Sequence, residues 1–309
     1  LRAVLEAMGE GEQYMELKLE VQEELADVLE LAGRYDEAIE VLKKRIAETI
    51  TARPLEAGKD YARMCEIYIK KGDYENALKM AEEGEQIVSG IEGSKIVLAR
   101  LWSAKGYVYE RTGNYSKAIE WQEKAKNVFV QENAEKDIGN VLNRIGVCYL
   151  DMGNYEKAYE YFQKSLELRE KNNDLRGIAA SYNNIGVICH EKGEYEKALE
   201  YYKRSIGIRE KIGDLWGVAA SYNNIGAIYY EKGEYEKALE CFVRSLRVKE
   251  KIGDLRGVAS SYNNIGTIYY EKGDYEKALE NFQKSLEIGT QIGDIASIVE
   301  AQTSLSEVY

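Results

Sequence analysis

Apolar residues recur at helical spacing in paired segments along most of the chain, and residues 214–253 show the pattern clearly. Within residues 215–232 the apolar or small positions follow the i, i+3, i+4, i+7 rule of an amphipathic helix: Val218, Ala219, Tyr222, Ile225, Gly226 and Tyr229. A second segment, residues 235–252, directs another set inward: Ala238, Leu239, Phe242, Leu246 and Val248. The pattern predicts two helices that form a hairpin.

Glycine and aspartate mark the ends of these helices. Gly233 and Gly253 can adopt the left-handed conformation that ends a helix. Asp254 follows at once and can cap the next helix by accepting hydrogen bonds from its free N–H groups. So short a connection predicts that consecutive hairpins stack tightly.

The hairpin pattern is an internal repeat. The string Gly-x-Tyr-x-x-Ala occurs seven times at intervals of 39–41 residues, starting at Gly33, Gly72, Gly113, Gly153, Gly193, Gly233 and Gly273. Residues 174–213 and 214–253 share 28 of 40 positions. Repeats of this length are typical of solenoids, in which each unit packs only on its neighbours.

Counting the repeats divides the chain into seven full hairpins and two half-units within one domain, residues 1–309. The hairpins are expected at about 17–52, 56–92, 97–133, 137–173, 174–213, 214–253 and 254–293, and the half-units at 1–9 and 294–309. The last half-unit either caps the solenoid or needs more chain or a partner to cover it. Because the chain starts at Leu1 with no Met, we expect a fragment of a longer protein.

The repeat resembles the tetratricopeptide repeat. In the unit after Asp174, the resemblance rests on Tyr182, Ile185, Gly186, Gly193, Tyr195, Ala198 and Tyr202. Its period of about 40 exceeds the common 34 and is similar to the longer variety of kinesin light chains and of sensor domains in STAND-type signalling ATPases. The resemblance implies an all-α fold, an α-solenoid that winds antiparallel hairpins into a right-handed superhelix. Gly186 and Ala198 would then lie where the two helices of a hairpin cross.

Composition excludes several function classes. With 42 Lys+Arg against 54 Asp+Glu, the net charge is −12, so nucleic acid is not an expected partner. No apolar run approaches the ~20 residues that span a bilayer, so no membrane segment is expected. The four cysteines show no metal-binding spacing and are interpreted as small buried residues of a cytoplasmic protein.

Catalytic chemistry is not expected either. His190 is the only histidine, and neither a Gly-Lys-Ser/Thr phosphate loop nor an H-E-x-x-H metal motif occurs. We therefore predict a protein without enzymatic activity, metal or cofactor.

The resemblance implies that the first helix of each hairpin lines a concave groove. One inward position carries a ladder of asparagines: Asn143, Asn183, Asn223 and Asn263. Two turns further along lies a second column with adjacent acids: His190, Tyr230 and Tyr270 beside Glu191, Glu231 and Glu271. Asparagine donates and accepts hydrogen bonds, so such a ladder suits the backbone of an extended peptide. The next residues, Asn184, Asn224 and Asn264, are predicted to bond hairpin to hairpin instead.

Trp216 interrupts a position that holds arginine in the flanking repeats, Arg176 and Arg256. It is either an exposed anchor for a partner or packed on its neighbour. The acids along the groove of the C-terminal repeats favour a neutral or basic peptide segment there.

Two functions remain open. The leading hypothesis is a protein–protein interaction solenoid that binds an extended peptide. The alternative is a ligand-sensing, autoinhibitory sensor domain of a larger STAND-type ATPase or transcription regulator, whose partners include other domains of the same chain.

Overall fold

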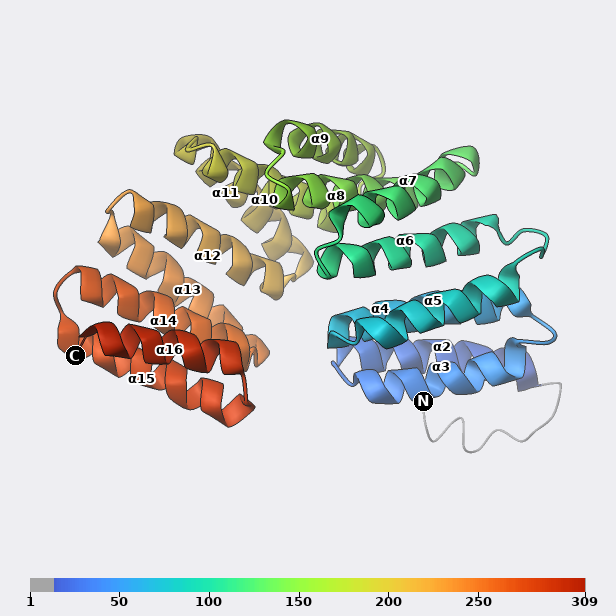
Figure 1. The fold of residues 1–309 in the computed structure, drawn as a ribbon, viewed down its shortest axis with the longest axis horizontal. Helices are drawn as coiled ribbons and strands as arrows, with labels where there is room; N and C mark the ends of the chain where they lie inside the picture. Colours follow the sequence, from blue (N-terminus) through green and yellow to red (C-terminus); the bar gives the residue numbers. More distant parts are fainter. Residues whose placement is uncertain (1–13, 309) are drawn as a thin grey trace. The chain divides into compact units, whose positions relative to one another are not determined.

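The computed structural model describes residues 14–308, and within that range all regular structure is helical, with no strand (Figure 1). The helices are α2 (Met15–Leu31), α3 (Tyr35–Thr49), α4 (Pro54–Lys71), α5 (Tyr74–Val88), α6 (Lys95–Arg111), α7 (Tyr115–Gln131), α8 (Glu135–Asp151), α9 (Tyr155–Lys171), α10 (Leu175–Glu191), α11 (Tyr195–Ile212), α12 (Leu215–Glu231), α13 (Tyr235–Ile252), α14 (Leu255–Glu271), α15 (Tyr275–Ile292) and α16 (Ile295–Val308). The predicted all-α solenoid is confirmed. None of the described helices is both long enough and apolar enough to cross a membrane.

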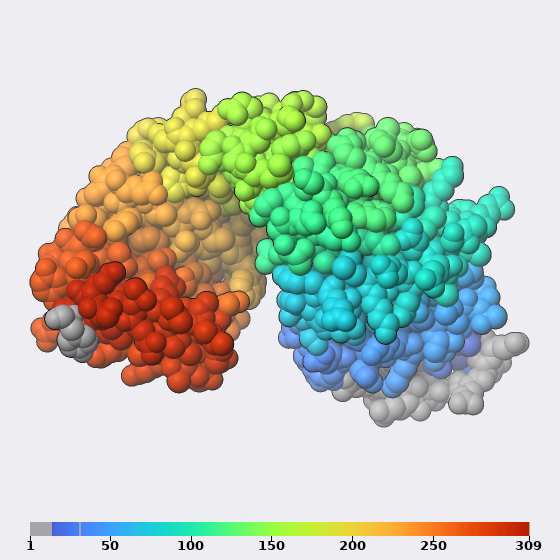
Figure 2. Space-filling view, in the orientation of Figure 1, coloured from blue at the N-terminus to red at the C-terminus, as the bar shows by residue number. Residues whose placement is uncertain are grey.

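The chain forms two compact units, Leu1–Tyr161 (unit 1) and Phe162–Tyr309 (unit 2). In unit 2, α10 packs on α11, α12 on α13 and α14 on α15, and each hairpin also packs on the next. The first helices of successive hairpins touch as well, as α14 and α16 do. Because each hairpin packs on the next one in the sequence, the colours of the surface in Figure 2, which mark residue number, follow the chain order within each unit.

The predicted helix boundaries agree with the structure in the hairpin of α12 and α13. The segments expected at 215–232 and 235–252 are Leu215–Glu231 and Tyr235–Ile252. The half-unit expected at 294–309 contains α16, whereas the one expected at 1–9 lies outside the described residues.

Local hydrogen bonds explain where these helices start and stop. The carboxylates of Asp214 and Asp254 each accept from the backbone N–H three residues on, at 3.1 and 2.9 Å. Gly213 and Gly253 end the preceding helices with φ of 72° and 74°. Asn173 takes the same left-handed conformation one hairpin earlier, with φ of 51°, because asparagine tolerates it better than most residues.

Small residues let the two helices of a hairpin approach closely. A Cβ atom on Gly226 would lie 2.7 Å from the ring of Phe242, and one on Gly186 would lie 2.8 Å from the ring of Tyr202. Ala198 is fully buried. The predicted helix crossing at Gly186 is therefore confirmed, and the burial of Ala198 agrees with its predicted position.

Tyr202 carries a buried hydroxyl group with no hydrogen-bond partner among the described residues. The next two hairpins place Phe242 and Phe282 at this position. Burial also raises the pKa of the Tyr202 hydroxyl. The phenol therefore costs stability that phenylalanine would not.

We expect Tyr202→Phe to raise the free energy of unfolding by about 1 kcal/mol, because a buried unpaired polar group loses its hydration without compensation. Urea unfolding followed by far-UV circular dichroism measures the change. The matched control is Tyr182→Phe, since the Tyr182 hydroxyl donates to Glu170 at 3.2 Å on the exposed surface. The control should be neutral or slightly destabilising, and equal effects of both variants would contradict the prediction.

Unit 1 contains a buried ion cluster between α3 and α4. Arg45 is 5% exposed and donates to Asp60, which is 2% exposed, at 2.8 Å. The same guanidinium group pairs with Glu23 at 3.0 Å and with Glu56 at 3.6 Å. Burial raises the pKa of Asp60 to about 7, although Arg45 opposes the shift. The charge on Asp60 is thus tolerated in the core only because Arg45 faces it.

Candidate functional site

The asparagine pairs of unit 2 connect one hairpin to the next. Asn264 Nδ2 donates to Asn223 Oδ1 at 3.1 Å, and Asn224 Nδ2 donates to Asn183 Oδ1 at 3.5 Å. Ser221 Oγ also donates to Asn183 Oδ1, at 3.2 Å. Asn224 and Asn264 therefore bond hairpin to hairpin, as predicted.

These bonds change what the first asparagine offers. Because the side-chain oxygens of Asn183 and Asn223 already accept, the ladder presents their Nδ2 groups as donors. Neither Nδ2 group has a partner among the described residues, and both side chains are half-buried. The ladder is thus a set of N–H donors rather than of bifunctional amides.

Asn263 does not extend this ladder, contrary to the sequence interpretation. It is 5% exposed, and its Nδ2 donates to Glu300 Oε1 on α16 at 2.9 Å. Its Oδ1 is buried without a partner. The physical reason is the residue 37 positions after each asparagine. After Asn263 this residue is Glu300, whose side chain is long enough to reach back and accept the hydrogen bond. After Asn183 and Asn223 it is Ala220 and Ser260, whose side chains are too short.

Asn143 lies in unit 1. It is half-buried on α8 and is engaged in an interaction there. Within unit 2, the donor ladder therefore consists of Asn183 and Asn223.

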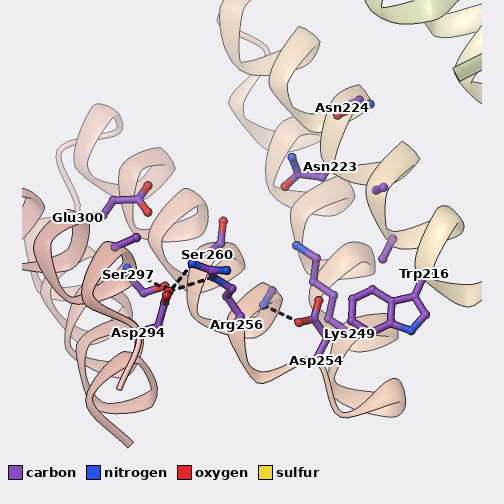
Figure 3. Close-up of a pocket in the computed structure, with 14 residues that line it drawn as sticks. Trp216, Asn223, Asn224, Lys249, Asp254, Arg256, Ser260, Asp294, Ser297 and Glu300 are labelled. Atoms are coloured by element: carbon purple, nitrogen blue, oxygen red, sulfur yellow. Dashed lines mark hydrogen bonds and ion pairs between the residues drawn. The ribbon is translucent and has the colours of Figure 1, made fainter. Parts of the chain in front are cut away.

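A pocket of about 560 Å³ opens beside Asn223, between the first helices of two successive hairpins, α12 and α14, and the helix of the last half-unit, α16 (Figure 3). It is lined by Trp216, Ala219, Ala220, Asn223, Asn224, Lys249, Asp254, Arg256, Gly257, Ser260, Asp294, Ala296, Ser297 and Glu300. Figure 3 shows Asp294, Ser297 and Glu300 on one side, and Asn223 and Trp216 on the opposite side. We call this the inner pocket.

The charges of the inner pocket are partly paired. Arg256 donates to both carboxylate oxygens of Asp294, at 2.7 and 3.2 Å. The hydroxyl and backbone N–H of Ser297 also donate to Asp294, and together with Arg256 they hold its pKa below the ordinary value. Lys249 donates to Ser261 Oγ at 2.9 Å, and burial lowers its pKa.

Trp216 changes the charge pattern at the pocket mouth. It is 60% exposed and stands where Arg256 stands one hairpin later. Arg256 forms an ion pair with Asp294. One hairpin earlier the same two positions hold Trp216 and Asp254, so Asp254 has no arginine to pair with there. The pocket wall therefore combines an exposed indole with an acid that has no arginine partner. The structure places Trp216 as an exposed side chain, not a packed one.

The second predicted column lies elsewhere, at the turn between the two helices of each hairpin. His190 Nε2 lies 2.9 Å from Glu231 Oε2, and Tyr230 Oη donates to Glu271 Oε1 at 3.3 Å. Tyr270 packs its ring on that of Tyr275, with centroids 5.6 Å apart. None of the column's residues, including exposed Glu191, lines the inner pocket.

This column was predicted as part of one groove with the asparagines; it lies two turns further along the same helices and does not line the inner pocket. The reason is the helical position: these residues end α10, α12 and α14, where they reach the next hairpin's turn. The sequence carried a signal for these contacts, because His190 and Tyr230 are each followed 41 positions later by the glutamate that they contact, Glu231 and Glu271.

The described residues contain no cluster of three or more His, Cys, Asp or Glu side chains that could hold a metal ion. Donor groups, an exposed indole and carboxylates are the chemistry that the inner pocket offers. This combination suits non-covalent binding of a chain segment.

Comparison with known families gives three matches, all to models of the tetratricopeptide repeat. They cover residues 137–211 and 217–291, residues 99–128, and residues 23–54. A search of curated proteins found no match.

Several solved structures have a similar fold. A Rap protein in complex with Competence and Sporulation Factor has a TM-score of 0.69 at 16% identity, covering 99% of this chain and 89% of that one. The STAND protein with a tetratricopeptide repeat sensor from Pyrococcus horikoshii has a TM-score of 0.66 at 18% identity, covering 94% of this chain but 44% of that one. BtubC (BKLC) from P. vanneervenii has a TM-score of 0.57 at 20% identity, covering 72% and 90%. At these identities the likeness concerns the fold alone.

Proposed function

Because the chain belongs to the tetratricopeptide repeat superfamily, whose solenoids are generally protein-interaction scaffolds, we propose that it is a non-catalytic protein that binds an extended peptide segment along α10, α12 and α14. The observation that carries this proposal is the pair of unpartnered amide donors, Asn183 and Asn223, that leads to the inner pocket.

Donors in a row suit a peptide backbone for a simple reason. An extended chain presents carbonyl oxygens along its length whatever its side chains are, and each can accept from an asparagine Nδ2. A side chain of the peptide would then enter the inner pocket beside Trp216, because large exposed aromatic residues are frequent anchors at interfaces. Backbone recognition would supply affinity, and the pocket would supply selectivity.

The charge of the inner pocket favours a neutral or basic segment. Its lining holds three carboxylates, Asp254, Asp294 and Glu300, against the two cations Lys249 and Arg256. Asp254 uses one carboxylate oxygen to cap α14, and Glu300 uses one for Asn263. A lysine or arginine side chain of the peptide would pair with the remaining oxygens.

We expect the double variant Asn183→Ala/Asn223→Ala to bind a peptide selected against the wild type about 10- to 100-fold more weakly, because two hydrogen bonds of roughly 1 kcal/mol each are lost. Peptides are selected from a random library displayed on phage, and affinities are measured by fluorescence anisotropy. Trp216→Ala should weaken binding further.

The matched control is Tyr230→Phe, which removes a hydrogen bond at the turn edge and not in the inner pocket. Circular dichroism must show unchanged helicity for every variant. Selected peptides that bind the double variant as tightly as the wild type would contradict the groove proposal.

The similarity to a STAND protein supports a second candidate function. The alignment covers 94% of the present chain and 44% of that protein, which has a tetratricopeptide repeat sensor. In this version the peptide or ligand would enter a sensor domain that restrains the rest of a larger cytoplasmic protein. The gene sequence upstream distinguishes the two, because a phosphate-binding loop of the form G-x-x-x-x-G-K-[ST] would favour the sensor.

A further inference from the structure

Unit 2 has a second pocket of about 490 Å³ that shares no lining residue with the inner pocket. It lies over α12 between the second helices of two hairpins, α11 and α13, and we call it the outer groove. Ile206 and Ile225, both buried, contribute to its apolar surface, and the half-buried rings of Tyr222 and Tyr229 line it. The site is an amphipathic cleft of a size common for small ligands.

Gly207 opens this groove, and neither packing nor backbone conformation requires glycine there. Glycine in a helix interior is less stable than alanine by roughly 0.5–1 kcal/mol. The other helical glycines of unit 2 within the described residues would each bring a Cβ to within 3.1 Å of another atom, but a Cβ on Gly207 would meet nothing within 4 Å. The missing side chain thus leaves empty space at the groove surface.

The following hairpin supplies an internal comparison. The equivalent groove keeps its two tyrosines, Tyr262 and Tyr269, but has Arg247 in place of Gly207. It also has Asn281, which donates to the carbonyl of Lys277, in place of Cys241. Both exchanges in the outer groove are toward a smaller or less polar side chain, which leaves more open space there than arginine and asparagine would.

Cys241 was predicted from the sequence to be buried like the other cysteines, and this prediction is wrong. Cys65, Cys148 and Cys189 are buried, whereas Cys241 is half-buried and lines the outer groove. The physical reason is the empty space above Gly207, which leaves the facing side of α13, where Cys241 lies, partly exposed.

The charge around the outer groove is opposite to that of the whole chain. Its lining carries three cations, Lys203, Lys237 and Arg244, against two acids, whereas the chain has a net charge of −12. Arg244 lies over the ring of Tyr222 at 5.6 Å. Lys203 is exposed and has no ion-pair partner among the described residues. In the next hairpin Val243 occupies its position.

We propose that the outer groove binds a small planar aromatic monoanion, with its ring between Tyr222 and Tyr229 and its acid group on Lys203. The tyrosines provide flat contact area, Ile206 and Ile225 provide the apolar floor, and the space at Gly207 admits the ring edge. This site is separate from the peptide groove, so either proposal can fail without the other.

The test uses 2-naphthoate as probe and the Cys241 thiol as reporter. N-ethylmaleimide labels accessible thiols, and peptide mapping by mass spectrometry separates Cys241 from the buried cysteines. Burial raises the pKa of Cys241 to about 11, so labelling is run at about pH 8.5 for long times. We expect about 1 mM 2-naphthoate to slow labelling of Cys241 at least threefold, while the same concentration of 2-naphthamide, the uncharged analogue, leaves the labelling rate nearly unchanged.

Two variants localise the effect. Gly207→Leu fills the cleft and should abolish binding of 2-naphthoate measured by calorimetry. Arg247→Leu places the same side chain at the equivalent position one hairpin later and should leave binding unchanged. Lys203→Gln should weaken binding about tenfold. Unprotected Cys241, equal protection by the amide, or binding that survives Gly207→Leu would each overturn the proposal.

Discussion

Arg45→Met is expected to lower the free energy of unfolding of unit 1 by about 3–5 kcal/mol at pH 8, since removal of one partner leaves a buried charge uncompensated. Asp60 is 2% exposed, and its 2.8 Å contact with Arg45 is the short ion pair that balances its charge. Methionine keeps much of the volume of the arginine stem, so the loss reports the charge rather than a cavity. Urea unfolding of unit 1 is followed by the fluorescence of Trp102 and Trp121, in a Trp216→Phe background that removes the tryptophan of unit 2.

The pH dependence of this loss follows from the pKa of Asp60, which is raised from 3.8 to about 7. The folded state holds the proton more tightly than the unfolded state, so between about pH 4 and pH 7 folding takes up protons. Stability of unit 1 therefore falls as pH rises through this window, by at most ~1.4 kcal/mol per pH unit for one proton. Asp60→Asn should flatten this slope, and the deficit of Arg45→Met should be smaller at pH 5.5 than at pH 8.

The matched control for Arg45 is Arg34→Met, which removes an exposed ion pair with Glu37 and should cost no more than about 1 kcal/mol. The double variant Arg45→Met/Asp60→Leu should recover most of the stability, because both charges are then absent. If Arg45→Met and Arg34→Met cost the same, the buried pair is not a determinant of stability.

Gly226→Val is the second substitution with a large expected effect, a loss of about 2–3 kcal/mol in the stability of unit 2 from overpacking at a helix crossing. The added Cβ would lie 2.7 Å from the ring of Phe242, and Phe242 is 5% exposed, so the ring has little space to retreat. Thermal unfolding followed by far-UV circular dichroism measures the loss.

Gly207→Ala is the matched opposite of this change. Its Cβ meets nothing within 4 Å, so it should raise stability by about 0.5–1 kcal/mol through the lower entropy of the unfolded chain. A further variant, Gly226→Val/Phe242→Ala, should lose less than the sum of its single changes, because the smaller side chain makes room. Independent, additive effects at Gly226 and Phe242 would contradict direct contact between them.

Much of the fold could be predicted because its determinants are local. Asp254 and Gly253 are adjacent in sequence, and each acts within one helix end, so their roles can be inferred without a partner. Gly186 and Tyr202 belong to one hairpin, and the repeat itself indicates that their positions face each other. The periodicity of residues 215–232 likewise predicts α12 almost to its ends.

The candidate site was only partly predictable because its partners come from the neighbouring hairpin. Asn183, Asn223 and Asn263 are identical in the sequence, yet the residue that follows each by 37 positions is alanine, serine or glutamate. Only Glu300 reaches back, so Asn263 is engaged and buried while the others keep free donors. The sequence shows the identity of these residues but not the direction of each hydrogen bond.

The hairpins, their caps and the repeat of the tetratricopeptide repeat superfamily can all be inferred from the amino-acid sequence, because these features depend on residues close together in the chain. The packing of separate helices sets which asparagines keep free donors and places Cys241 at the border of an open cleft. Those properties depend on the distance and size of side chains on separate helices. A gap such as that at Gly207 exists only when every neighbour leaves the space empty, and periodicity carries no information about empty space.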